Sequence, residues 1–180
     1  VTRVVIGLDG PSRDVVDVLA LAGVPLPIAA VPDILAGLSD PAQVRAAIHT
    51  LVRRGGVRFE PGRPPRPRTV RLHPVEADWC TQQLFAGPTS RQQGLDRRLA
   101  DWYATQRMPA VLWRSAEDVN PQRLEFRHRW RSGDPDEALA VEESVGRAVE
   151  TAGQVIVFAG GTVVIAILGL AVAGVPMMTA

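Results

Sequence analysis

Residues 40–74 constrain the fold most, because a helical pattern is followed directly by two strand patterns. Asp40 can cap the helix with its carboxylate, and Pro41 suits the first turn, where a missing N–H costs nothing. The apolar residues that follow share one helical face (Val44, Ala47, Ile48, Leu51 and Val52). Gly55 and Gly56 end the pattern, since glycine tolerates the left-handed conformation after a helix. We therefore predict one amphipathic helix between Asp40 and Gly55.

The strand patterns predict a β-hairpin. Residues 57–59 and 70–72 alternate between apolar and charged side chains, so each can bury one face. Between them, residues 61–68 hold four prolines and three arginines and cannot be helical. Two shorter helices are expected upstream, Arg13–Leu21 with Ser12 as its cap and Ile28–Leu35. Three helices followed by a hairpin predict a winged helix-turn-helix over residues 10–75.

The next part of the chain, residues 76–150, also has helical patterns. We expect helices over Pro74–Phe85 and Ser90–Arg107, and two more that begin near Pro121 and Asp136. Residues 111–113 fit no single element. The chain as a whole is therefore predicted to be mainly α.

The last thirty residues, 151–180, carry no charge. An apolar run of this length can span the hydrocarbon core of a bilayer, and we predict a transmembrane helix over residues 153–177. The alternative is a buried helix of a larger soluble protein. On the membrane interpretation the chain is tail-anchored and single-pass, with the preceding part in the cytoplasm. The arginines and acids upstream leave its orientation open.

Charge is distributed unevenly, although the net charge is only +1. Residues 41–73 carry eight arginines and one Glu, which gives +7. All twenty basic residues are arginine, a bias typical of GC-rich genomes. Cys80 is the only cysteine, so no internal disulfide can form, and we expect a small buried hydrophobe in a reducing compartment. The first residues lack the pattern of a signal peptide.

Several segments resemble a known family. The segments LDGPSRDVVDVLALAGVPLP, DPAQVRAAIHTLVRRGGVRF and TVRLHPVEADW resemble the winged-helix region of bacterial STAND ATPases of the NB-ARC type. RRLADWYATQRMP and NPQRLEFRHRWRSGDPDEALAV resemble the start of the tetratricopeptide-like array that follows in that family. The resemblance implies that His73 matches a histidine that reaches the phosphate of a bound nucleotide. The chain has no P-loop and no lysine, so it would be a truncated relative without the ATPase core.

The basic residues suggest one alternative function, DNA binding. Arg45, His49 and Arg53 share the polar face of the third helix, and the hairpin adds Arg63, Arg66 and Arg68. A helix beside a basic wing is how such folds meet phosphates and the major groove. The competing interpretation is a solvated face on a winged helix used only for packing.

No reaction centre is evident in the sequence. His73, Glu76 and Cys80 lack a fourth ligand and a standard metal spacing, and no nucleophile–base motif occurs. We therefore expect no enzyme activity, no metal, no cofactor and no small-molecule substrate. A single helical repeat unit should leave Trp102, Trp113 or Trp130 partly exposed for a protein partner. The hypothesis is a non-enzymatic regulatory or interaction module with a membrane tether, with a membrane-anchored transcription regulator as the alternative.

Overall fold

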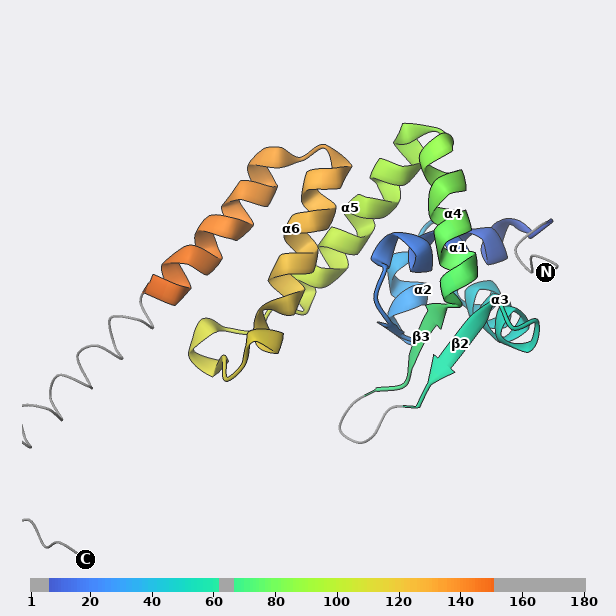
Figure 1. Cartoon of the computed structure of the whole chain (residues 1–180), viewed down its shortest axis with the longest axis horizontal. Coiled ribbons are helices and arrows are strands. Elements are labelled where there is room, and N and C mark those ends of the chain that lie inside the picture. The colour runs from blue at the N-terminus through green and yellow to red at the C-terminus, as the bar shows by residue number, and fades with distance from the viewer. Residues whose placement is uncertain (1–6, 62–66, 151–180) are drawn as a thin grey trace, which may run out of the picture.

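A computed structural model describes residues 7–61 and 67–150 of the chain (Figure 1). Its helices are α1 (Gly10–Ala22), α2 (Ala30–Ile34), α3 (Pro41–Arg53), α4 (Pro74–Ala86), α5 (Thr89–Thr105) and α6 (Asn120–Ser132). Its strands are β1 (Leu26–Pro27), β2 (Val57–Glu60) and β3 (Thr69–Leu72), and its 3-10 turns are η1 (Ala110–Leu112) and η2 (Ala116–Val119). A further helical segment covers residues 135–150. The prediction of a mainly α chain is confirmed.

Helix α1 lies at the centre of the core. Val15, Val16 and Val18 are fully buried, and α1 contacts α3, α4, α5 and β3. The cap differs from the prediction: Asp9, and not Ser12, caps the helix, by accepting the Ser12 backbone N–H at 2.9 Å. An aspartate three residues before Ser12 can accept an unpaired backbone N–H of the first turn as well as a serine can. The helix therefore begins nearer the N-terminus than predicted, at Gly10.

Helix α3 and the hairpin form as predicted. The Asp40 carboxylate accepts the N–H of Ala42 at 2.6 Å. The apolar stripe of α3 is buried except for Val52, which is partly buried. Strands β2 and β3 pair antiparallel with Phe59 opposite Val70, and β1 adds a third strand in the order β1-β3-β2. The second helix is shorter than predicted, since α2 holds only Ala30–Ile34.

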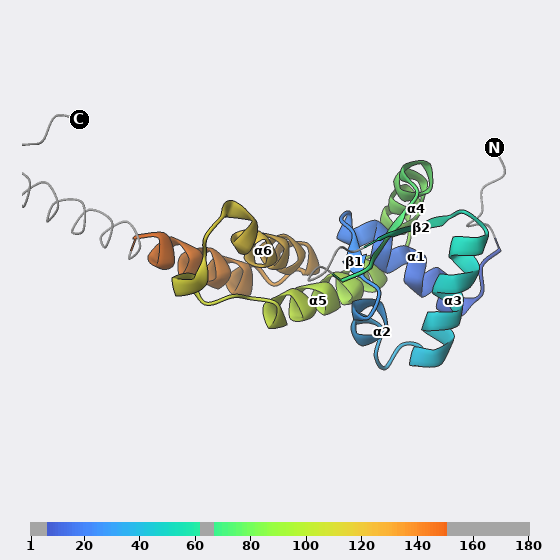
Figure 2. The same cartoon turned by 90° about the horizontal axis from the view of Figure 1, so that it is seen from below.

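Helix α5 connects this core to the rest of the molecule. Its residues Leu95, Leu99 and Tyr103 belong to the same buried apolar cluster as α1, α3 and the sheet. Helix α6 packs along α5, and residues 135–150 lie at the opposite end of the elongated molecule from α3, as both views show (Figures 1 and 2). The position of α6 therefore depends on its contact with α5.

Three smaller predictions can be compared with the structure. Residues 110–112 form a 3-10 turn, so the ambiguous 111–113 segment is not a strand. Cys80 is buried, as predicted, and burial raises the pKa of its thiol to about 12. The predicted transmembrane helix at 153–177 lies outside the described residues, and no helix within 7–61 and 67–150 is long and apolar enough to cross a membrane.

Candidate functional site

The contact between α5 and α6 is a buried layer of polar side chains. Every buried residue of α6 is polar: Gln122, Glu125, His128 and Ser132. Asp96 of α5, fully buried, faces them. Burying charged groups is costly unless each is paired. This layer is therefore the least ordinary part of the described structure, and we treat it as the candidate site.

His128 and Asp96 form the centre of the layer. The Nδ1 of His128 lies 2.7 Å from Oδ1 of Asp96, and both side chains are fully buried. The Nε2 of His128 lies 3.2 Å from Nη2 of Arg127, which can only donate. The ring is therefore neutral, with its proton on Nδ1 donated to Asp96. Burial is the main reason that the pKa of His128 lies below its ordinary value; the Asp96 bond opposes this shift, and Arg127 adds to it.

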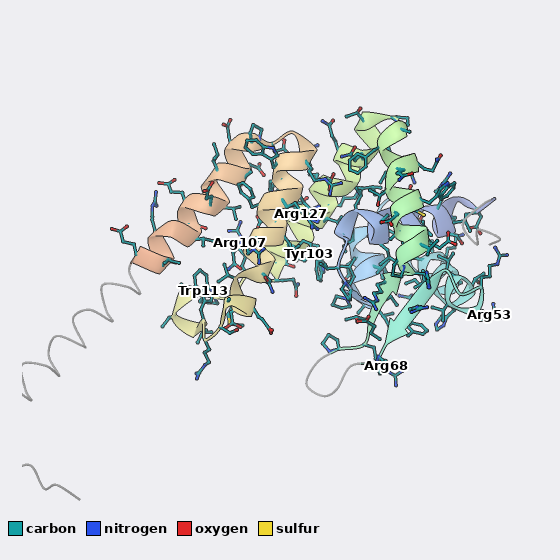
Figure 3. The ribbon with its side chains drawn as sticks, viewed as in Figure 1. Arg53, Arg68, Tyr103, Arg107, Trp113 and Arg127 are labelled. Atoms are coloured by element: carbon teal, nitrogen blue, oxygen red, sulfur yellow. The ribbon has the colours of Figure 1, made fainter. Side chains whose placement is uncertain are left out.

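Tyr103 and Arg127 cover this pair. The Tyr103 ring stacks on the His128 ring with centroids 5.7 Å apart and planes 5° apart. Its hydroxyl is buried without a partner among the described residues, and burial raises its pKa to about 12. Arg127 also donates from Nη2 to the carbonyl of Ala22, at the end of α1. Burial lowers the pKa of this guanidinium. Figure 3 labels Tyr103 and Arg127 close to each other, in the region where α5 and α6 meet.

A second ionic cluster surrounds Glu125, whose side chain is 1% exposed. Arg107 donates two hydrogen bonds to its carboxylate, and these bonds are the main reason that the pKa of Arg107 is raised. Arg129 lies 3.8 Å from Glu125 and reaches Asp101 of α5 at 2.8 Å and Glu137 at 2.9 Å. The cluster therefore connects α5, α6 and the helical segment after α6.

The chemistry open to this layer is limited by its enclosure. His128 has no exposed surface, so a substrate cannot reach it in this conformation. Within the described residues no group of three His, Cys, Asp or Glu side chains could hold a metal ion. The layer joins α6 to α5 through buried hydrogen bonds and ion pairs.

His73 lies away from this layer. It precedes α4, is half-buried, and its backbone N–H donates to the carbonyl of Gly56 at 2.9 Å. Its carbonyl accepts the N–H groups of Glu76 and Ala77. The structure thus gives His73 a backbone role at the junction of hairpin and helix.

The predicted DNA-binding residues lie at the other end of the molecule. Arg45, His49 and Arg53 are exposed on α3, and Arg68 is exposed just before β3. The His49 ring meets the Phe59 ring edge-on at 6.1 Å, which joins the helix to the hairpin. Arg63 and Arg66 lie outside the described residues.

The three tryptophans predicted to bind a partner do not form one surface. Trp102 is half-buried against the core, and its ring centroid lies 4.9 Å from that of Tyr103. Trp113 donates its indole N–H to the carbonyl of Met108 at 2.9 Å. Trp130 is 56% exposed and stacks on Phe126, with the two ring centroids 6.1 Å apart. The expected partial exposure is confirmed, most clearly at Trp130.

Sequence reasoning missed the polar layer, although a signal was present. Residues 122, 125, 128 and 132 recur every three or four positions and are all polar. Such spacing puts them on one helical face, which is ordinarily the solvent face. Only the matching polar residues, Asp96 on α5 and Arg107 just after it, suggest that this face is buried.

Comparison with known proteins concerns the second half of the chain. Residues 114–180 match the MMPL family. The matched region starts just after Trp113 and includes α6 but not α5. A segment of 44 residues is 50% identical to the membrane protein YdfJ of Bacillus subtilis, covering 24% of this chain and 6% of that protein. No solved structure is significantly similar to the chain.

These similarities overturn the identification made from the sequence. Residues 120–141, the second of the two segments read as the start of a tetratricopeptide-like array, lie within the MMPL match. The resemblance to STAND regulators is therefore wrong. The nucleotide-sensing role of His73 rested on that resemblance alone and stays an untested prediction. The regulatory interaction module and its alternative, the DNA-binding regulator, are wrong for the same reason. Motifs of short amphipathic helices are shared by many folds, which explains the error. The expected association with a membrane is supported.

Proposed function

We propose that this chain is a piece of a transporter-like membrane protein of the MMPL type. The observation that carries the proposal is the family match over residues 114–180. MMPL family members are transporters. The chain spans 6% of the length of its curated relative, so the activity and substrates of the whole protein belong to this proposal. That this chain itself is not an enzyme stays a prediction.

In this proposal the layer between α5 and α6 holds the helices that lead to the bilayer. Residues 135–150 are helical and carry five acids and one arginine, and the uncharged residues 151–180 follow directly. An abrupt change from charged to uncharged sequence is typical of a chain entering a membrane. We propose residues 153–177 as that membrane segment. The finer expectation of a single-pass tail anchor has no support from the described helices.

The finer description of the fold is also part of the proposal. The order α1, β1, α2, α3, β2, β3 is compatible with a winged helix and supports that part of the proposal. We propose this arrangement for residues 10–75 as a packing unit only, followed by a helical segment over residues 76–150.

Membrane extraction tests the proposal. The full chain should stay in the membrane pellet after alkaline carbonate washing. Ile165→Arg with Leu168→Arg should release it, because each arginine at the centre of a membrane helix costs about 3 kcal/mol of insertion free energy. The matched control is Leu139→Arg with Val149→Arg, two exposed positions of the preceding helix, and should stay in the pellet. Full release of the unaltered chain by carbonate would contradict the proposal.

A further inference from the structure

The proposed function leaves one charged surface unused, at the α3 end of the molecule. We define the basic face as the exposed side of α3 and the adjoining hairpin: Arg45, His49, Arg53, Phe59 and Arg68. Arg45, His49 and Arg53 are four residues apart, so they follow one side of α3. Figure 3 shows Arg53 and Arg68 at the end of the molecule away from Trp113.

The hairpin residues belong to the same face because of strand register. Phe59 pairs directly with Val70, and their side chains point to the same side of the sheet. Arg68 lies immediately before β3, next to Thr69, and its side chain is exposed. The edge-on contact of Phe59 with His49 shows that this side adjoins α3.

The arginines of this face are free to meet an outside partner. Within the described residues, Arg45, Arg53 and Arg68 form no ion pair with a carboxylate. By contrast Arg71, on the other side of the sheet, is paired with Glu60 at 2.6 Å. Phe59 is 40% exposed among these cations. Guanidinium groups bind phosphates, and an exposed aromatic ring suits the headgroup level of a bilayer.

We propose that the basic face binds the surface of an anionic bilayer. Charge complementarity selects the lipid, and the similarity of residues 114–180 to membrane proteins favours a bilayer over a nucleic acid. Here the inference rests on the proposed function. An apolar segment already in the membrane raises the local concentration of lipid around the basic face, so a small patch is sufficient.

The shape of the molecule sets how both contacts form together. The basic face and the end of the helical segment at residue 150 lie at opposite ends of the long axis (Figure 1). The helical segment 135–150 is acidic and would be repelled by anionic lipid, with five acids against Arg147. The molecule therefore lies along the bilayer with α3 and the hairpin as its second contact.

Vesicle flotation of the full chain tests this inference. Binding is measured to pure phosphatidylcholine vesicles and to vesicles with roughly one third phosphatidylglycerol, at low and high salt. The test variant is Arg45→Gln, Arg53→Gln and Arg68→Gln. The matched control is Arg13→Gln, Arg58→Gln and Arg114→Gln, three exposed arginines off the face that change the net charge equally.

We expect the chain to bind anionic vesicles more tightly than neutral ones, and salt to weaken that difference. Removal of each arginine on the face should weaken anionic binding about fivefold, or roughly a hundredfold for three. The control should keep its anionic preference within about twofold. Circular dichroism establishes that both variants are folded.

Three results would overturn the inference. The first is equal affinity of the chain for the two vesicle types, and the second is an equal loss of anionic binding in the test and control variants. The third is a test variant that keeps its vesicle binding and loses only affinity for duplex DNA in a gel shift. Failure of the proposed function has a different signature. It would abolish binding to neutral vesicles, which depends on residues 151–180, while a salt-sensitive preference for anionic vesicles would still support the basic face.

Discussion

At the scale of single residues, His128 shows how a buried titratable group can hold two helices together while neutral. Its ring donates to Asp96 and accepts from Arg127, so both nitrogens are used only when one proton is present. A second proton would place an N–H against the guanidinium of Arg127. Protonation of this ring is therefore coupled to the contact of α6 with both α5 and α1.

This coupling predicts loss of stability in acid. The pKa of His128 is lowered by burial below the unfolded value of about 6.5. Between the two values the unfolded chain binds more protons, so the free energy of unfolding falls as pH falls. The stabilisation is complete above about pH 6.5 and is lost as pH falls through the folded-state pKa. Urea unfolding between neutral and mildly acidic pH measures the slope.

The His128→Gln variant separates this effect from other titrations. A glutamine can donate to Asp96 and accept from Arg127 without titrating. It should therefore flatten the slope, while His49→Gln, at an exposed position of α3, should keep the original slope. An unchanged slope in His128→Gln would show that another group controls the acid response.

At the scale of elements, the turn after α6 decides where the next helix goes. Gly133 ends α6 with φ 84°, in the left-handed region, and Asp134 accepts two hydrogen bonds from Arg97 of α5. Gly146, in the following helical segment, has ordinary helical geometry and open space where a Cβ would lie. The backbone conformation at position 133 therefore requires a glycine, whereas the conformation at position 146 does not.

The same substitution should have opposite effects at these positions. Gly133→Ala should destabilise the fold by about 1 kcal/mol, because a side chain is disfavoured at positive φ and its Cβ would lie 3.2 Å from Nε2 of Gln93. Gly146→Ala should stabilise the helix by about 0.5–1 kcal/mol, since alanine loses less backbone entropy. Thermal unfolding measures both, and effects of the same sign would contradict the assignment.

At the scale of the whole molecule, Arg127 connects α6 to α1. It lies on α6 and donates to the carbonyl of Ala22 at the end of α1, 105 residues away in sequence. Apolar residues of α5 complete the core, whereas α6 depends on polar contacts. The arrangement of α6 relative to the core is therefore sensitive to a few charged side chains.

Arg127→Met should loosen α6 while leaving the core intact. The hydrogen bond of a charged donor is worth about 1.5 kcal/mol, so amide exchange in residues 120–132 should accelerate about tenfold. Exchange in α1 and α3 should not change. The control is Arg123→Met on the same helix, whose side chain bonds only to the nearby Asn120 among the described residues. Equal acceleration in both variants, or acceleration throughout the core, would contradict this role.

Local sequence determined α3 and the hairpin, because an aspartate cap, an apolar stripe and period-two strands act within a few residues of each other. The absence of charged side chains after Glu150 is also evident from the sequence alone, and it predicts a membrane segment. It did not determine the family, since the helices that suggested a STAND protein have patterns common to many folds.

Tertiary structure alone decided the environment of the polar residues on α6. Gln122, Glu125 and His128 have the spacing of a solvated face. They are buried because Asp96 and Tyr103 of α5, and Arg107 just after it, supply complementary partners. The pairing of two helices depends on both faces at once, and the sequence of one helix cannot specify it. For the same reason the pKa of His128 is a property of the fold and not of the sequence.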